Sequence, residues 1–219
     1  EGGNGSLLKP FNEWRDVNWQ PNTDYLQKAG TVAVASFTVS VQGTADAPVT
    51  IGSYGDEPTG GARNRPQIQG AITFDNASYV TLQGMDIYGA PFGAVTLLDG
   101  ANHITVRDNE IRDSQAGVLI RASAGGDNRI DGNVVHNNAG QGIAMAGGVQ
   151  GHGDVIAYNS IIANGLHGIE ISSNYSIIEY NEVMSNGNLT IGTSGIHTHV
   201  EAYGDGTGHD LVIRLNVVG

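Results

Sequence analysis

Two histidines, a glutamate and an arginine occupy positions from which they could carry out acid–base chemistry. His197 and His199 lie two residues apart in GIHTHV, and Glu170 lies in the related segment GIEISS. A histidine with a pKa near its usual value of about 6.5 can accept or donate a proton at neutral pH. Arg121, in GVLIRA, could hold a substrate carboxylate by its charge. We therefore expect His197, His199, Glu170 and Arg121 to form a catalytic group.

The same part of the sequence supports other chemistries. Glu170, Glu201 and Asp205 carry oxygen ligands of the kind that Ca²⁺ prefers, so they are candidate metal ligands. Glu170 and Glu201 could instead be the two carboxyl groups of a glycoside hydrolase, which lie about 5–9.5 Å apart. A His-x-His pair also occurs in zinc sites, but no third ligand is identified. Further residues are expected to contact a substrate, namely Ser172, Tyr203 and His209.

An internal repeat determines how these residues are positioned. Short segments of similar pattern begin with an apolar residue, and the spacings between successive first residues are 23, 23, 25, 26 and 27. These first residues are Ile72, Val95, Val118, Ile143, Ile169 and Ile196. A period in the twenties with two or three short strands per repeat indicates a solenoid. The Leu spacing and helical half of leucine-rich repeats are missing, so we predict an all-β, parallel β-helix.

A shared asparagine supports the β-helix. The later repeats contain a second segment with Asn at one position, as in RDNEI, DGNVV, AYNSI, EYNEV and RLNVV. An Asn side chain can both donate and accept between successive turns, and its backbone tolerates the left-handed conformation of a tight bend. We predict that Asn133, Asn159 and Asn181 are buried and contact one another from rung to rung.

Strand parity places the candidate residues on one exposed face. Neighbouring side chains in a strand point in opposite directions, so the residue after each buried first residue faces outward. Glu170 and His197 then belong to one outward column, and Arg121, Ser172 and His199 to a second. Rungs lie about 4.8 Å apart, so the candidates lie within a few rungs of one another. Insertions before Ile196 and in VEAYGDGTGHD would form the walls of a cleft there.

Composition excludes several classes of function. The formal net charge is −12 with only ten Lys and Arg residues, which argues against binding to nucleic acid or an anionic membrane. The absence of Cys excludes disulfides and thiolate sites. No apolar stretch approaches the roughly 20 residues of a membrane-spanning helix. These features are consistent with a bacterial secreted or periplasmic protein.

The repeats and the opening segments GNGSLLKPFNEWRDVNWQPNTDYLQKAGTV and GTADAPVTIGSYGD resemble right-handed parallel β-helix proteins of the pectate-lyase-like superfamily. The resemblance covers nearly the whole chain. It implies a secreted enzyme that degrades polysaccharide, with a lyase acting on a uronic-acid-containing polymer as the leading expectation. Many such lyases use Lys or Arg as the base. This chain departs from that pattern, because Lys9 and Lys28 both precede the repeats.

A non-catalytic protein is the main alternative to a lyase. The same fold could provide a carbohydrate-binding surface, an adhesin or a segment of a phage fibre. The irregular last repeat favours the enzyme, because a structural fibre needs no insertions there.

The two ends of the chain are expected to differ. Residues 1–30 are predicted to enter and cap the coil, with a short helix in PFNEWRDV, and residues 31–219 to form the repeats. RLNVVG ends within a rung, so the C-terminal end is predicted to be uncapped. Solenoids need a polar cap for solubility. We therefore expect self-association, or a C-terminal portion that this sequence lacks.

Overall fold

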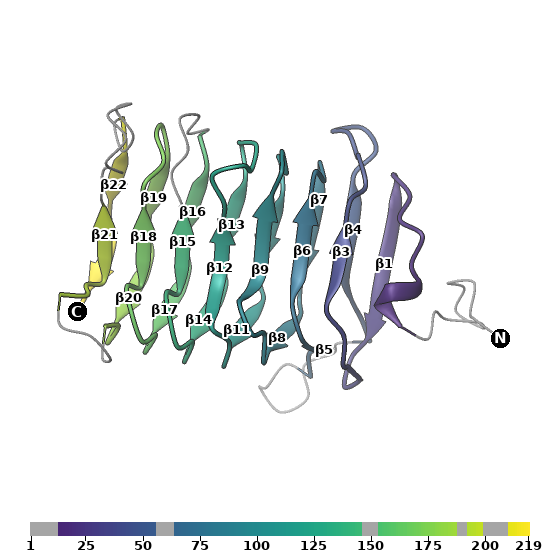
Figure 1. Cartoon of the computed structure of the whole chain (residues 1–219), viewed down its shortest axis with the longest axis horizontal. Coiled ribbons are helices and arrows are strands. Elements are labelled where there is room, and N and C mark those ends of the chain that lie inside the picture. The colour runs from purple at the N-terminus through teal and green to yellow at the C-terminus, as the bar shows by residue number, and fades with distance from the viewer. Residues whose placement is uncertain (1–12, 56–63, 146–152, 188–191, 199–209) are drawn as a thin grey trace.

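The computed structural model describes residues 13–55, 64–145, 153–187, 192–198 and 210–219. Within these ranges the chain forms a coil of short strands in which every pairing between strands of successive rungs is parallel (Figure 1). The predicted all-β parallel β-helix is therefore confirmed. The described residues also include one turn of 3-10 helix, η1 (Trp14–Asp16).

Each rung except the last described one contributes one strand to each of three sheets, which we call sheets 1, 2 and 3 in the order in which the chain visits them. Sheet 1 contains β1 (Thr23–Lys28), β4 (Val49–Tyr54), β7 (Val80–Gln83), β10 (Thr105–Arg107), β13 (Arg129–Asp131), β16 (Val155–Ala157), β19 (Ile177–Glu179) and β22 (Val212–Arg214). Sheet 2 contains β2 (Val32–Ala33), β5 (Gln67–Gln69), β8 (Asp86–Tyr88), β11 (Glu110–Arg112), β14 (Val134–His136), β17 (Ser160–Ile162), β20 (Glu182–Met184) and β23 (Val217–Val218).

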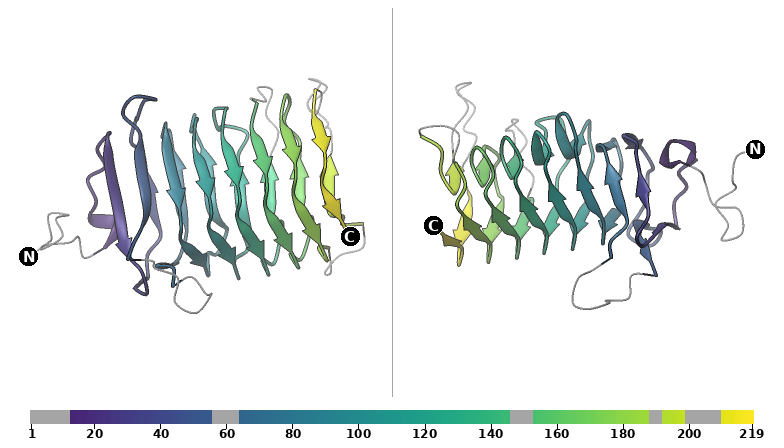
Figure 2. Two further views of the ribbon diagram at one scale, coloured as in Figure 1. Left: turned by 180° about the vertical axis from the view of Figure 1, so that it is seen from behind. Right: turned by 90° about the horizontal axis from the view of Figure 1, so that it is seen from below.

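Sheet 3 carries the residues predicted to be functional. It contains β3 (Phe37–Val39), β6 (Ile72–Asp75), β9 (Gly93–Leu98), β12 (Ala116–Ile120), β15 (Ile143–Met145), β18 (Ile169–Ile171) and β21 (Ile196–Thr198). The views from behind and from below show the same regular succession of rungs (Figure 2). Strand β1 belongs to sheet 1, where it pairs in parallel with β4.

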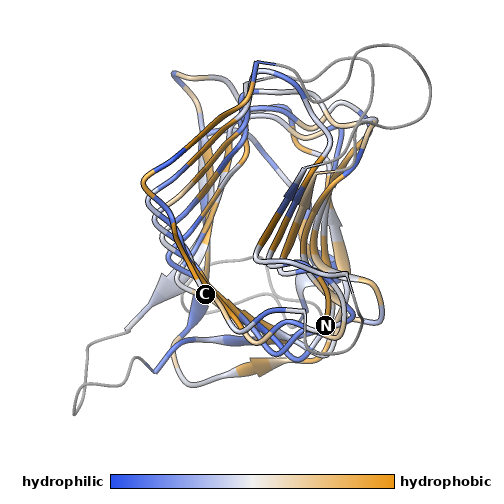
Figure 3. Ribbon diagram, turned by 90° about the vertical axis from the view of Figure 1, so that its left-hand side faces the viewer, coloured by the Kyte–Doolittle hydropathy of each residue, from blue (hydrophilic) through white to orange (hydrophobic). Residues whose placement is uncertain are grey.

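The apolar core fills the inside of the coil, which is bounded by the three sheets when viewed from the C-terminal end (Figure 3). The predicted inward column is confirmed, because each of its members pairs with the next in sheet 3. Ile72, Val95, Val118, Ile143 and Ile169 are fully buried, and Ile196 on the last strand of the sheet is half-buried.

The predicted asparagine ladder lies at the bend between sheets 1 and 2. The side-chain amide of Asn133 donates to Oδ1 of Asn159 at 3.0 Å, and that of Asn159 donates to Oδ1 of Asn181 at 2.9 Å. Asn109 and Asn216 extend the same ladder at its two ends. Each amide also donates to a strand carbonyl, as Asn159 does to Ile130 at 2.9 Å. The ladder prediction is therefore confirmed.

A second ladder lies at the bend between sheets 2 and 3. The amide of Asn138 donates to Oδ1 of Asn164, and that of Asn164 donates to Oδ1 of Asn186, both at 2.9 Å. At the bend between sheets 3 and 1, Asn128 donates to the buried carboxylate of Asp154 at 3.0 Å. All three bends are thus braced by buried polar side chains, which fixes the register of the rungs.

The two ends of the coil differ as expected. At the N-terminal end, Trp14 of η1 stacks on Phe37 with ring centroids 5.2 Å apart and on Trp19 at 6.0 Å. The predicted N-terminal capping segment is confirmed as this aromatic cluster, and the described part of its predicted helix is the single 3-10 turn η1. At the other end, Ile213, Val217 and Val218 are exposed, which confirms the predicted apolar surface.

Candidate functional site on the outer face of sheet 3

One outward column runs along sheet 3 through aligned positions in successive strands. The aligned residues are Thr38, Thr73, Thr96, Leu119, Ala144, Glu170 and His197. Glu170 lies between the buried residues Ile169 and Ile171, so its side chain points away from the core. The register predicted from repeat spacing is correct, and it places Glu170 beside His197 on adjacent rungs.

Gln141 holds the carboxylate of Glu170. The side-chain amide of Gln141 donates to Oε2 of Glu170 at 2.6 Å. Gln141 belongs to the preceding rung, two residues before β15, so this contact crosses from one rung to the next. A half-buried carboxylate with a hydrogen-bond donor on one oxygen is held in a defined orientation. Glu170 is therefore suited to orient a ligand or a neighbouring side chain.

His167 packs against His197 and is a site residue that the sequence analysis did not identify. Their rings stack with centroids 4.3 Å apart and an interplanar angle of 14°. The backbone N–H of Ser194 donates to Nδ1 of His167 at 3.1 Å. A nitrogen that accepts a hydrogen bond carries no proton, so this contact selects the tautomer of His167 with its proton on Nε2. His167 thus gives His197 a fixed neighbour.

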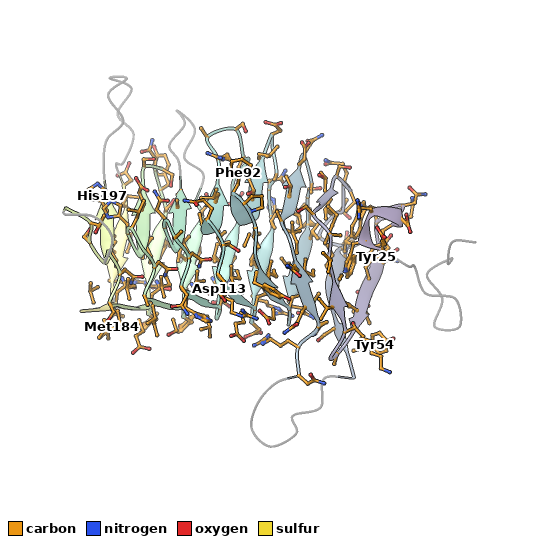
Figure 4. All side chains as sticks on the ribbon, turned by 60° about the horizontal axis from the view of Figure 1, so that its bottom comes forward. Tyr25, Tyr54, Phe92, Asp113, Met184 and His197 are labelled. Atoms are coloured by element: carbon orange, nitrogen blue, oxygen red, sulfur yellow. The ribbon has the colours of Figure 1, made fainter. Side chains whose placement is uncertain are left out.

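A groove of about 320 Å³ lies on this face, N-terminal to His197 along the coil. Leu119 and Ala144 of the outward column form its floor, and Arg121, Glu170 and Gln141 supply its polar groups. Phe92 lies at its rim and is 74% exposed. Figure 4 shows Phe92 midway along the coil and His197 near the C-terminal end. The structure therefore brings Arg121 and Glu170 to one groove, as expected.

Ser172 also lines the groove, but its predicted exposure is wrong. The residue is completely buried, and its hydroxyl donates to the backbone carbonyl of Met145 at 2.9 Å. The chain leaves β18 after Ile171, so strand parity no longer decides the direction of the next side chain. A role in contacting substrate would require this hydroxyl to leave its backbone partner.

Several predicted site residues lie outside the described residues. These are His199, Glu201, Tyr203, Asp205 and His209. The candidate carboxyl pair of Glu170 and Glu201 and the second histidine of the His-x-His pair therefore stay predictions.

No group of three or more His, Asp or Glu side chains that could hold a metal ion occurs in the described part of the chain. Glu170 is the one proposed calcium ligand with a described position, and one of its oxygens already accepts a hydrogen bond from Gln141. Glu201 and Asp205 lie outside the described residues, so the calcium site stays a prediction, and no chemical step is assigned to calcium.

Solved structures with a similar fold include several carbohydrate-active enzymes. The alginate lyase from Paenibacillus sp. str. FPU-7 is 18% identical with a TM-score of 0.71, over 91% of this chain and 80% of the lyase. The GH136 lacto-N-biosidase from Eubacterium ramulus is 14% identical with a TM-score of 0.75, over 98% of this chain and 53% of the enzyme. Pectate lyase Pel9A is 12% identical with a TM-score of 0.55, over 89% of this chain and 66% of the lyase.

At these identities the likeness establishes the fold alone. A search of curated protein sequences found no match. In the described residues, no helix is long and apolar enough to cross a membrane. The family described as "Right handed beta helix region" matches residues 70–217, which is more than half of the chain. The chain therefore belongs to the right-handed β-helix family, with the pectate-lyase-like fold.

Proposed function

We propose that the outer face of sheet 3 binds a uronic-acid-containing polysaccharide and cleaves it by β-elimination. The observation that carries this proposal is the pairing of Glu170 with His197 on adjacent rungs, next to a groove that also contains Arg121. Proton transfer and carboxylate binding are the two requirements of this reaction, and these side chains can supply both. The structural similarity to an alginate lyase and a pectate lyase supports the choice of substrate class.

Each residue has a distinct role in this proposal. Arg121 binds the carboxylate of the uronate and stabilises the negative charge that develops when the adjacent C–H is deprotonated. His197 or His199 transfers the proton, and Glu170 keeps the neighbouring His197 in position. As the C–H electrons form the new double bond, the glycosidic C–O bond breaks and its oxygen gains a proton. Water is not consumed, which distinguishes this reaction from hydrolysis.

A polymeric substrate suits an open face better than a closed pocket would. The groove lies on the side of the coil, where a chain of sugars can lie across successive rungs. Such polymers occur outside the cytoplasm, so we also propose a secreted or periplasmic location. We also propose that Glu170, Glu201 and Asp205 could bind calcium. The roles given above to Arg121, Glu170 and the histidines do not depend on this ion.

A panel of uronate polymers tests the activity directly. The lyase proposal expects ultraviolet absorbance from the unsaturated product together with new reducing ends. Reducing ends without absorbance would contradict elimination and favour a hydrolase that uses Glu170 and Glu201. Binding without either signal would contradict the enzyme and favour a carbohydrate-binding surface.

Single substitutions then test the histidines. Removal of a general acid or base lowers the rate by about 10²–10⁴. We expect at least one of His197→Ala and His199→Ala to show such a loss, and added imidazole to restore part of it. His136→Ala is the matched control, because His136 lies on sheet 2 near Glu110, with 3.3 Å between Nε2 and Oε1. Full activity in both site variants would contradict the proposed roles.

A further inference from the structure

The outward column of sheet 3 changes character along the coil. Its first positions are Thr38, Thr73 and Thr96, and it ends in Glu170 and His197. Between these two polar stretches the column is apolar, and this apolar stretch forms the floor of the groove. Neither proton transfer nor carboxylate binding, as proposed above, requires apolar side chains there.

Leu119 and Ala144 give the floor a definite shape. Leu119 lies across Gly93 of the neighbouring rung, where an added Cβ would come within 2.8 Å of its Cδ1 atom. Ala144 is aligned with Leu119 on one side and Glu170 on the other. A methyl side chain between two longer ones leaves a depression in the floor of the groove. The depression is thus of a size suited to a small apolar group.

Polar groups surround this depression on several sides. The carboxylate of Glu170 lies one rung from Ala144, with Gln141 donating to its Oε2 atom. Gln115 is exposed on the groove wall, and Arg121 supplies a positive charge. A ligand group that fits must therefore carry a small apolar end next to hydrogen-bonding atoms. Phe92 at the rim adds an exposed aromatic surface on which a sugar ring can pack.

An unmodified uronate unit does not match the floor. A hydroxyl group of such a unit, placed against Leu119 and Ala144, would lose water without gaining a partner there, which is unfavourable. An acyl substituent matches better, because its methyl group gains from burial while its carbonyl can accept from Gln115 or Arg121.

We propose that the groove selects a sugar unit bearing an acetyl group, with the methyl placed against Leu119 and Ala144. This inference rests on the proposed uronate polymer and narrows it to acylated forms, either O-acetylated or containing an N-acetylated amino sugar. Arg121 binds a uronate carboxylate while the acyl group occupies the floor.

Binding to matched oligosaccharides, measured by isothermal titration calorimetry, tests the proposal. One pair is an O-acetylated oligouronate and the same oligosaccharide after mild alkaline deacetylation, which leaves its charge unchanged. The second pair contains alternating uronate and amino sugar, N-acetylated in one member and N-formylated in the other, so that only the methyl differs. We expect removal of the methyl or acetyl group to weaken binding at least about fivefold in one pair. Equal or tighter binding of the members that lack the acetyl group, in both pairs, would overturn the proposal.

Two variants and a control locate the effect. Leu119→Thr introduces the residue type that occurs at the aligned position of the preceding rung, and Ala144→Val fills the depression. Both should reduce the preference for the acetylated member of each pair to less than about twofold. Thr73→Leu, in the same column but outside the groove, should leave it unchanged. Circular dichroism and a melting curve establish that each variant is folded, and an unchanged preference in both folded groove variants would overturn the proposal.

The outcomes separate this inference from the proposed function. Cleavage or binding of uronates without acyl preference would refute the inference and leave the lyase proposal standing. Binding of neutral N-acetylated oligosaccharides, with no binding or cleavage of any uronate, would support the acyl site and refute the uronate polymer.

Discussion

Asp154 is an acidic residue at a buried position where a neutral amide would suffice. Its Oδ1 atom accepts from the backbone N–H of Asn128 at 2.8 Å and from the side-chain amide of Asn128 at 3.0 Å. Desolvation by burial raises the pKa of Asp154 to about 6, although the two bonds from Asn128 favour the charged form. The folded protein therefore binds a proton at this site more tightly than the unfolded chain does.

This shift predicts a pH dependence of stability. Because the pKa in the folded state lies above the ordinary 3.8, the stabilising contribution is complete below about pH 4 and is lost as the pH rises to about 6. The shift corresponds to about 3 kcal/mol of unfolding free energy. Asp154→Asn should remove this dependence and stabilise the protein at pH 7.5 by about 1–3 kcal/mol. Urea unfolding of both proteins at pH 4 and pH 7.5 checks this, and a variant with the same difference between the two pH values would contradict it.

His167 is predicted to position His197 through the stacked rings. In the proposed lyase, His167→Ala should lower kcat about 10-fold to 100-fold with little change in KM, since the ring of His197 loses its neighbour. His167→Phe keeps a ring at this position and should recover most of kcat. Steady-state measurement of kcat and KM for the two variants tests this prediction. Equal losses in both would show that the hydrogen bond from Ser194, rather than the stack, is what matters.

At the level of elements, the asparagine ladder fixes the register between neighbouring rungs. Asn159 donates to Asn181 and to the carbonyl of Ile130, and its Oδ1 accepts from both the backbone and the side chain of Asn133. Asn159→Ala leaves these buried groups without partners, so we expect a loss of about 1–3 kcal/mol in unfolding free energy. The neighbouring Ser160→Ala removes an exposed contact to Glu182 and should change stability by less than about 0.5 kcal/mol. Equal melting temperatures for the two variants would argue against the ladder.

Strand parity and repeat spacing were sufficient to predict the sheet 3 columns, because a parallel solenoid repeats the same environment at every rung. The second ladder was missed, although its signal is present in the sequence. Asn138, Asn164 and Asn186 each follow an asparagine of the first ladder by five residues, as Ser114 follows Asn109. This constant spacing from the first ladder would have identified the second ladder.

The part of the site that could not be predicted lies where strand parity ends. Ser172 follows the last residue of β18 and is turned into the protein by its bond to Met145. His167 lies before β18, and only the three-dimensional course of the turn brings its ring onto His197. In turns, the direction of a side chain depends on the local backbone conformation and not on the two-residue alternation of strands. The positions of such side chains therefore become known only from the three-dimensional structure.

At the scale of the whole molecule, the first and last described rungs of the coil differ in how their apolar side chains are covered. The stack of Trp14, Trp19 and Phe37 covers the first rungs. At the opposite end, Ile213 and Val218 are aligned with the fully buried Ile178 and Val183 of the preceding rung, yet they are about half exposed. They are core positions that no further described rung covers.

The exposed apolar residues of the last described rung predict self-association of a polypeptide made of these residues. Exposed core residues beside the edges of β22 and β23, which pair with no further strand in the described residues, favour contact with another strand edge or apolar surface. Sedimentation velocity should therefore show an average mass that increases with protein concentration. Ile213→Lys or Val218→Lys should shift the equilibrium toward monomer, because a lysine at a core position of the end rung opposes close packing. Val134→Lys is the control, since Val134 is 40% exposed on the side of the coil and should leave association unchanged. A single monomeric species at all concentrations, or an equal effect of all three variants, would show that the apolar end does not drive association.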